Sequence, residues 1–468
     1  MKPFPAQPER PAKHANPALQ GAFEPWPCEG YIHDLEVAGT LPQDLQGTYY
    51  RNGPNPQYVL NERYHLFDGD GMVHAFAFSG GRVRYRNRWV RTEKFELERA
   101  AGRSLFGGML NWWRDPSVAD GSPNLANTSL IRHGGRLLAL YEAGLPTEID
   151  PLTLETLGPF DFEGGLDRAM TAHPKRDPPT GELLFYSYIF GATRELVFYR
   201  ADASGAILES RKIPTPFQSM IHDFAITESY VIFPLFPLTL NRERIAKGQS
   251  PIAWEPGLGT RFAVVPRRGD EPIRWFRTEA CFAFHFMNAY EDGGTIVLDA
   301  IVADRIPENA RPFQGGKDEF PTRLIRWTLD GESQQVGKEV LDDSRGEMPR
   351  MDERFCGRKY RHGYFVAQSD AAKPEGLWNT VVHIDLHTKT TRKLTLPGED
   401  ALSEAVFVPK GEGEGEGYLL VLAYRGATGK SDLLILDAAA IDAGPIAEIR
   451  IPHRVPVGFH GCWLDAAA

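Results

Sequence analysis

The sequence has little cysteine and no long hydrophobic run. Its 468 residues include four cysteines, none of them in a CxxC pair: Cys28, Cys281, Cys356 and Cys462. This usage argues against a disulfide framework or a sulfur-ligated zinc site, and it favours a reducing, cytoplasmic location. The most hydrophobic stretch, residues 230–240, is about half a membrane span and contains two prolines, so we expect no transmembrane segment.

An excess of positive charge is also missing. Acidic residues outnumber basic residues by 62 to 52, which gives a formal net charge of -10. Because nucleic-acid binding needs a basic face for the phosphates, nucleic acid is not an expected partner. The first residues contain no apolar stretch of the secretory type. The motifs GxSxG, GxGxxG and HExxH and the P-loop are absent as well, so nothing favours a hydrolase, a nucleotide-binding protein or a zincin.

What the sequence does contain is a recurring β unit: a strand, a turn built from Asp, Gly, Pro, Ser or Thr, and a second strand. Seven such hairpins are found, at 75–90, 148–158, 197–213, 262–277, 324–341, 381–396 and 433–451. We therefore predict an all-β fold, a seven-bladed β-propeller. A β-sandwich is the main alternative, but it would not account for seven similar hairpins. Residues 1–28 are predicted to form an N-terminal arm, and residues 29–468 a single propeller domain.

Four histidines lie in apolar surroundings between these hairpins. His285 is the clearest, in the middle of the aromatic run CFAFHFMNAY, and His173, His222 and His460 have similar neighbours. Burying an imidazole costs roughly 1–3 kcal/mol unless both ring nitrogens find partners. A lone histidine of this kind would be read as a core residue. Because the inner strands of a propeller converge on one axis, four of them predict a shared metal site.

Three glutamates occupy comparable apolar positions between the hairpins: Glu142, Glu347 and Glu404. A surface salt bridge would account for any one of them alone. Beside four histidines, we expect them to accept the distal N–H of the ligands and so fix each tautomer. Four neutral imidazoles with an open position suit Fe(II) and O₂ chemistry, although residue type alone also allows zinc or copper.

A set of short motifs, taken together, identifies a protein family. They are YRNGPNP (50–56), FDGDGMVH (67–74), ANT (126–128), EAGLP (142–146), AHP (172–174), HDF (222–224), FH (284–285), EMPR (347–350), EAVFVP (404–409) and HG (460–461). With these motifs the sequence resembles the carotenoid cleavage oxygenase family, from about residue 47 to residue 463.

The resemblance implies a propeller with a dome of loops and short helices over the metal axis. It implies one Fe(II) per chain, bound by His173, His222, His285 and His460. It also implies that Glu142, Glu347 and Glu404 are the partners of His222, His285 and His460, which leaves His173 without one. Thr128 matches a residue whose methyl group crowds an otherwise open coordination position. The implied reaction is cleavage of a C=C bond by O₂, giving two carbonyl products.

The substrate is predicted from the residues that match the family's cavity, namely Phe67, Met109, Tyr141, Phe284 and Met348. Members that cleave hydroxystilbenes and phenylpropenes hold the phenol with a Tyr and a Lys, and the matching positions here are Met109 and Tyr141. Losing both polar partners predicts an apolar cavity for a hydrophobic polyene, a carotenoid or apocarotenoid. The alternative is a lignostilbene, hydroxystilbene or isoeugenol-type phenylpropene.

Three further hypotheses stay open at this point. The apolar segments 105–113 and 231–240 are either core or an exposed patch for peripheral membrane contact. His383 and Asp385 have the His-x-Asp spacing of a facial-triad oxygenase, but in a polar outer hairpin. His65 and His74 match no ligand position and are expected to be structural. A propeller without catalytic activity, serving as a binding module, is the alternative from another class of protein.

Overall fold

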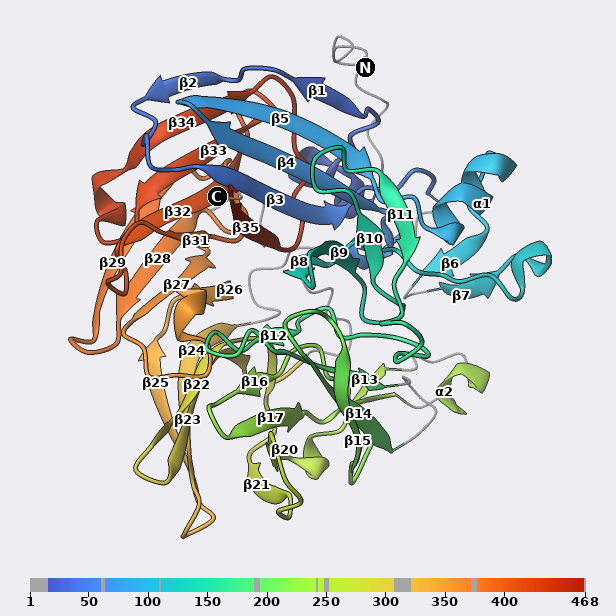
Figure 1. The fold of residues 1–468 in the computed structure, drawn as a ribbon, viewed down its shortest axis with the longest axis vertical. Helices are drawn as coiled ribbons and strands as arrows, with labels where there is room; N and C mark the ends of the chain where they lie inside the picture. The colour runs from blue at the N-terminus through green and yellow to red at the C-terminus, as the bar shows by residue number, and fades with distance from the viewer. Residues whose placement is uncertain are drawn as a thin grey trace.

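The structure is a computed structural model that describes residues 16–59, 64–108, 111–188, 194–240, 243–247, 252–306, 321–371 and 377–466. Within these ranges, seven antiparallel sheets of four or more strands are arranged around a central axis, which confirms the predicted seven-bladed propeller (Figure 1). All seven hairpins expected from the sequence are present in the sheets.

The blades are described from the inner strand outward. Blade 1 contains β35 (Gly461–Asp465), β3 (Gly47–Pro54), β4 (Gly71–Ser79), β5 (Arg82–Trp89) and β1 (Gly30–Ile32). Blade 2 contains β8 (Ser129–His133), β9 (Arg136–Leu140), β10 (Thr147–Ile149) and β11 (Thr156–Pro159). Blade 3 contains β12 (Lys175–Arg176), β13 (Leu183–Tyr188), β14 (Glu195–Ala201) and β15 (Ile207–Pro214). Blade 4 contains β16 (Ala225–Ile226), β17 (Tyr230–Leu235), β20 (Thr260–Pro266) and β21 (Arg274–Thr278).

The remaining blades follow the same order. Blade 5 contains β22 (Phe282–Asp292), β23 (Thr295–Ala303), β24 (Thr322–Asp330) and β25 (Val336–Asp342). Blade 6 contains β26 (Gly346–Met351), β27 (His362–Ala367), β28 (Thr380–Asp385) and β29 (Thr390–Thr395). Blade 7 contains β30 (Ala401–Leu402) and β31 (Val406–Pro409), then β32 (Gly417–Arg425), β33 (Lys430–Asp437), β34 (Pro445–Ile451) and β2 (Glu36–Gly39).

The ring is closed by strands from both ends of the described chain. Strand β2 pairs with β34 at the outer edge of blade 7, and β35 pairs with β3 at the inner edge of blade 1. Each blade also packs on its neighbours through its own apolar cluster, so seven clusters fill the seven interfaces. In β9, Leu137 and Ala139 face blade 1 while Leu138 and Leu140 face blade 3, because successive side chains of a strand point to opposite faces.

Aspartate side chains begin many of the outer turns. The carboxylate of Asp330, for example, accepts hydrogen bonds from the backbone N–H groups of Glu332 and Ser333 at 2.8 and 3.2 Å. Such a side chain mimics a backbone turn and fixes the hairpin register locally. The same arrangement recurs at Asp150, Asp202, Asp385 and Asp437. These residues are the turn signals by which the hairpins are recognisable in the sequence.

The segments that are not in blades lie between blades 1 and 2 and within blade 4. They include α1 (Glu93–Ala101), the hairpin β6 (Phe106–Gly108) and β7 (Asn111–Arg114), the hairpin β18 (Leu238–Leu240) and β19 (Ile252–Trp254), and α2 (Glu243–Ala246) (Figure 1). Short 3-10 helices are η1 (Pro17–Leu19), η2 (Gly21–Phe23), η3 (Leu66–Asp68), η4 (Pro116–Val118), η5 (Pro256–Leu258), η6 (Glu353–Phe355) and η7 (Ile441–Ala443). None of the helices in the described ranges is long and apolar enough to cross a membrane.

Residues 16–28 of the predicted arm lie against the propeller. Trp26 stacks on His453 with ring centroids 4.4 Å apart, and its backbone N–H and C=O both bond to the amide side chain of Asn55. This contact fixes the part of the arm that the structure describes. The division of the chain at residue 28 stays a prediction.

Candidate metal centre

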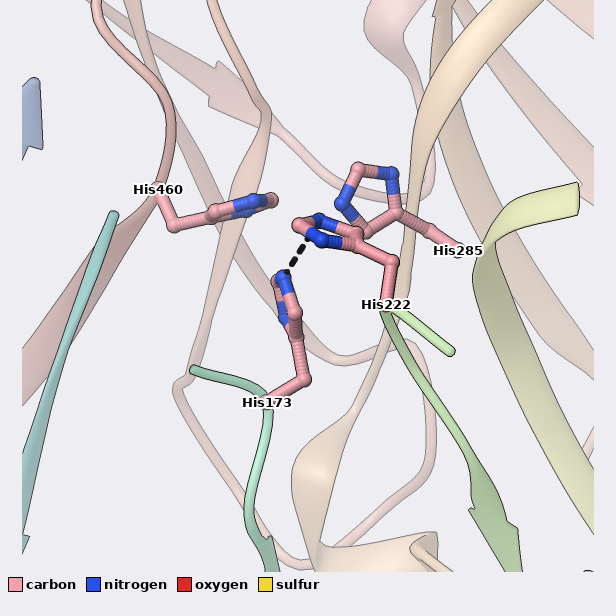
Figure 2. A group of neighbouring side chains, drawn as sticks. All are labelled: His173, His222, His285 and His460. Atoms are coloured by element: carbon pink, nitrogen blue, oxygen red, sulfur yellow. Dashed lines mark hydrogen bonds between the residues drawn. The ribbon is translucent and has the colours of Figure 1, made fainter. Parts of the chain in front are cut away.

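The four predicted histidines are brought together on the propeller axis (Figure 2). His285 lies in β22, whereas the others lie in the segments just before β12, β16 and β35. Each therefore sits at an inner strand of a different blade, as the hairpin spacing predicted. One ring nitrogen from each histidine lies within 4.8 Å of the other three. This is the one group of three or more potential metal-binding side chains within the described residues.

Three of these imidazoles are oriented by carboxylates. The Nδ1 of His222 bonds to Glu142 at 2.7 Å and the Nδ1 of His285 bonds to Glu347 at 2.7 Å. His460 bonds through Nδ1 to Glu404 at 2.9 Å. The three pairings are those expected from the sequence. In the described residues no carboxylate bonds to the fourth imidazole, that of His173, as was also expected.

These hydrogen bonds determine the protonation of the other ring nitrogen, Nε2, in each of the three histidines. An ionised carboxylate accepts a hydrogen bond from Nδ1–H, so the Nε2 of each of the three rings carries a lone pair. The Nε2 of His173 lies 3.0 Å from the Nε2 of His222, and the Nε2 of His285 is buried with no partner among the described residues. Several lone pairs at such short range repel one another unless a cation lies between them. The donor set therefore fits a metal ion bound by four neutral nitrogens.

Burial supports the neutral form of two of the rings. It lowers the pKa of His460 to about 4 and that of His173 well below its ordinary value, and the neighbouring histidines act in the same direction. For His285, burial also disfavours the charged form, but the Glu347 carboxylate overcomes this and raises its pKa. The same carboxylate accepts the 2.7 Å hydrogen bond from His285, and its negative charge stabilises the protonated ring.

Glu404 is held more firmly than the other two glutamates. It is 1% exposed, it accepts the backbone N–H of Gly461 at 2.7 Å, and it lies 3.4 Å from Arg350 and 3.9 Å from Arg51. Although burial opposes ionisation, Arg350 and His460 hold the pKa of this carboxyl far below its usual range. Arg51 itself is 1% exposed and donates to the carbonyl of Phe459, next to the ligand His460. A fixed charge network thus surrounds this ligand.

Local irregularities in two inner strands shape the centre. The register between β22 and β23 shifts between Ala283 and Phe286, on either side of the ligand His285. The register between β26 and β27 shifts between Glu347 and Arg350, and Met348 within this bulge has a positive φ of 56°. A β-bulge re-aims side chains, and a non-glycine residue in the left-handed region costs about 1–3 kcal/mol. The strained backbone coincides with the residues nearest the histidines.

A cavity of about 690 Å³ leads to one side of the histidines, and we call it the substrate cavity. It is lined by His222, His285 and His460 at one end and by residues of η3, α1 and β6 elsewhere. Four of the residues predicted to line it are found there, Phe67, Tyr141, Phe284 and Met348. Thr128, predicted instead to crowd an open coordination position, also lines the cavity. Met109, predicted to be a further cavity residue, lies outside the described residues.

The cavity is mainly apolar, but it is not apolar throughout, as was predicted. Its lining also includes Tyr58, Tyr64, Asp68 and Lys94. These residues come from η3, α1 and the loops around them, and their convergence depends on contacts that no local sequence pattern reveals. Lys94 and Glu98 have the spacing of an exposed i, i+4 pair, yet both are buried, and Lys94 bonds to Asp70 and Glu98 at 2.8 and 2.7 Å.

The hypothesis of an exposed apolar patch is not supported. In segment 231–240, the apolar side chains of β17 and β18 are buried in the clusters of blade 4. In segment 105–113, Leu105 and Phe106 are each 4% exposed, and Trp113, 41% exposed, lies where the substrate cavity opens. Apart from Trp113, the described apolar side chains of both segments belong to the interior and do not support membrane contact. Residues 109 and 110 and the side chain of Trp112 lie outside the described part of the chain.

The other histidines behave as the sequence suggested. His65 accepts a hydrogen bond from the backbone N–H of Phe67 at 3.1 Å and caps η3, and His74 bonds to the Tyr85 hydroxyl at 2.7 Å. His383 lies in β28 and bonds to His362 at 3.0 Å, away from the four-histidine group. The facial-triad hypothesis therefore has no site in the described residues.

The fold and this centre define a class: a seven-bladed β-propeller with a four-histidine group on its axis that can hold a metal ion. A sequence model of the retinal pigment epithelial membrane protein (RPE65) family matches residues 23–465. The chain belongs to this family, that of the carotenoid oxygenases, as the motifs indicated.

Individual members of the family differ in how similar they are to this chain. The chain is 39% identical to the isoeugenol monooxygenase of Pseudomonas nitroreducens, over 96% of this chain and 98% of the relative. The crystal structure of Pseudomonas brassicacearum lignostilbene dioxygenase superposes with a TM-score of 0.91 and 36% identity, covering 98% of this chain and all of that one. Cobalt-substituted Synechocystis ACO, an apocarotenoid oxygenase, gives a TM-score of 0.88 and 31% identity, covering 96% and 98%. These values favour the phenylpropene and stilbene alternative over the carotenoid prediction.

Proposed function

We propose that this protein is a non-haem Fe(II) dioxygenase that cleaves the C=C bond of a phenolic phenylpropene or hydroxystilbene. One oxygen atom of O₂ would go to each carbon, so that one alkene and one O₂ become two carbonyl compounds with no external reductant. The observation that carries the proposal is the four-histidine centre at the end of the substrate cavity, with three imidazoles oriented by glutamates.

The donor set supports iron. Four neutral nitrogens and no thiolate or carboxylate ligand leave a divalent ion with its full charge, and an ion with an open position can react with O₂. Bound Fe(II), one per chain, would supply the activation of O₂, a reaction for which redox-inert zinc is unsuited. The chain's own residues would orient the ligands, hold the alkene beside the ion and exclude water.

The cavity lining supports a substrate that carries a phenolic or ether oxygen. Tyr141 lines the cavity next to Glu142, and its hydroxyl has no hydrogen-bond partner among the described residues. Burial, followed by the charges of Glu142 and Asp68, raises the pKa of Tyr141 well above its ordinary value. The hydroxyl therefore stays protonated and can donate to a substrate oxygen, a role for which a polyene offers no partner. The named substrates of the relatives point the same way.

The remaining cavity residues have proposed roles in positioning. The rings of Phe67 and Phe284 contact Phe459 and His222 at centroid distances of 5.4 and 5.5 Å, so they can hold a planar substrate against the metal centre. Met348 would pack on the alkene from the bulge of β26.

Thr128 carries the proposed steric role through its methyl group. Its hydroxyl donates to the Asn127 side chain at 3.1 Å, and the Asn127 amide in turn donates to the carbonyls of Phe67 and Gly69 at 3.0 and 2.7 Å. This bond engages the hydroxyl, so that the methyl group would be the part of Thr128 that faces the open coordination position. Asn127 belongs to the ANT motif, but nothing in the motif itself assigned it this role.

The test is product analysis after anaerobic loading with Fe(II). Isoeugenol, a 4-hydroxystilbene and an apocarotenal are each supplied with ¹⁸O₂, and the products are identified by mass spectrometry at short reaction times. We expect 4-hydroxy-3-methoxybenzaldehyde and acetaldehyde from isoeugenol, each carrying one ¹⁸O, and a higher kcat/KM for the phenols than for the apocarotenal. A preference for the apocarotenal would overturn the substrate assignment.

A matched variant tests the role of Tyr141. Tyr141→Phe removes one neutral hydrogen bond, worth about 0.5–1.5 kcal/mol, so kcat/KM for isoeugenol should fall roughly 2- to 10-fold. The methyl ether of the phenol serves as the control for donation in the opposite direction, because it can accept a hydrogen bond but not donate one. It should lose as much as the phenol does. If only the phenol is affected, Tyr141 accepts rather than donates.

A further inference from the structure

A second cavity, of about 720 Å³, reaches the histidines from another side, and we call it the axial cavity. It is lined by inner strands β8, β12, β16, β22, β26 and β35. His285 and His460 border both cavities, but His222 borders the substrate cavity alone and His173 the axial cavity alone. The metal centre therefore separates two spaces, each with a ligand of its own.

The axial cavity is more polar than the substrate cavity and carries charged side chains of both signs. Lys175 pairs with the buried Asp223 at 2.6 Å, and Arg350 pairs with Glu404 at 3.4 Å. Glu353, whose side chain is 71% exposed, also lines the cavity. The space thus extends from the ring of His173 to solvent between charged groups of both signs. A cavity of this size and polarity accommodates water.

His173 differs from the other three ligands in how it is held. His222, His285 and His460 are each fixed by a carboxylate at 2.7–2.9 Å, whereas the Nδ1 of His173 has no hydrogen-bond partner among the described residues. His173 is also partly exposed, as is His222, but of the two only His222 has, in the described part of the chain, a carboxylate that holds its ring. It is the ligand that can turn away at the smallest energetic cost.

We propose that the axial cavity is the route by which the divalent metal ion enters and leaves, with His173 as the ligand that opens. Moving a hydrated dication into an apolar space without compensating polar groups costs several kcal/mol or more of solvation free energy. The axial cavity offers carboxylates and water up to the ligands. The substrate cavity, in contrast, presents Phe67 and Phe284, which do not line the axial cavity. Separate routes also allow the metal to exchange while substrate is bound.

The experiment measures metal release, so it is independent of whether the proposed reaction is correct. Protein loaded with Co(II) is mixed with a chelator in excess, and loss of the Co(II) absorption bands gives the release rate. Ile131→Trp, in β8, places an indole in the axial cavity, and Ile252→Trp, in β19, makes the same exchange in the substrate cavity. We expect metal release to slow about 10-fold or more in the first variant, which corresponds to at least ~1.4 kcal/mol of added barrier. The release rate of the second variant should be unchanged.

Two further measurements keep the proposal testable if one variant folds poorly. Cys356→Trp obstructs the axial cavity from another blade and should also slow release. In the wild type, a saturating hydroxylated bibenzyl, which lacks the reactive double bond, should occupy the substrate cavity and leave release unaffected. Slower release with Ile252→Trp or bibenzyl, or a wild-type rate in both axial variants, would overturn the proposal. An unchanged Co(II) spectrum in each variant shows that the ligands themselves are intact.

Discussion

The bond between Glu347 and His285 allows a graded test of how the centre is held together. Both side chains are about 5% exposed and their contact is 2.7 Å, so the bond is a charge-assisted one in a medium of low polarity. Glu347→Gln keeps an acceptor oxygen at nearly the same place but removes the charge. The difference between a charged and a neutral hydrogen bond is about 1–1.5 kcal/mol, which corresponds to roughly 5- to 13-fold weaker metal binding.

Glu347→Ala should cost more, because it also leaves the buried Nδ1 of His285 without a partner. That penalty is about 1–3 kcal/mol, so metal affinity should fall roughly 10- to 100-fold, within the range for residues that support metal ligands. Glu142→Gln should have the smallest effect of the three, since the Glu142 side chain is 23% exposed and solvent screens its charge. The expected order of metal affinity is therefore wild type, Glu142→Gln, Glu347→Gln, Glu347→Ala.

Competition with a chromophoric chelator measures these affinities, and thermal unfolding of the apoprotein separates them from general loss of stability. Glu332→Gln, an exposed glutamate in the outer turn of blade 5, is the control for charge removal. Glu404→Gln should differ in kind: among the described residues it leaves the buried Arg51 without a charged partner and Arg350 with Glu353 alone, so the apoprotein itself should melt at lower temperature. Full metal affinity in Glu347→Ala would refute the idea that the carboxylate orients the ligand.

Three other outcomes are expected. Asn127→Ala should free the Thr128 hydroxyl to approach the metal and change the Co(II) spectrum, whereas Thr128→Val, which has no hydroxyl, should make the same Asn127 change spectroscopically silent. Burial lowers the pKa of His453 to about 4, so its contribution to the free energy of unfolding is complete above pH 6.5 and is lost as the pH falls toward 4. Denaturant titrations should show that the free energy of unfolding falls by roughly 3 kcal/mol over this pH range. The fall should be absent in His453→Gln. Gly53→Ala would place a Cβ 2.4 Å from the Cα of Gly458, so its melting temperature should fall and metal binding should weaken through the neighbouring His460.

The propeller could be predicted from the sequence because its signals are local. The turn aspartates, of which Asp330 and Asp385 are examples, bond to backbone two or three residues away, and alternating strands such as 136–140 send side chains to both neighbouring blades. The metal ligands were recognisable for a related reason: an imidazole in an aromatic strand, like that of His285, is costly to bury unless its nitrogens bind a partner or a metal ion. Such patterns need no knowledge of which strands meet.

The character of the substrate cavity could not be predicted, because it depends on long-range packing. Lys94 looks like a surface residue of a short helix, and its burial follows from contact with Asp70 in another segment. Glu142 was expected in a strand context but lies in the turn between β9 and β10, where the chain bends to reach His222. Tyr141 was interpreted as a loss of a polar partner, although its hydroxyl remains available. The residue type at each of these positions does not reveal which side chains of other segments it will contact.

The pairing of β35 with β3 has a consequence for how the protein folds. Arg51 is opposite Gly461, so this pairing, like that of β2 with β34, joins distant parts of the sequence and carries a larger loop-closure entropy than the pairings within the other described blades. Contacts of such high sequence separation form late, and His460 reaches the axis only when they do. A chain with blades 2 to 6 formed but β35 not yet paired with β3 would hold three histidines and bind metal weakly. The uptake of metal during refolding should therefore lag behind the formation of β structure, and the ion would act as a reporter of the final step.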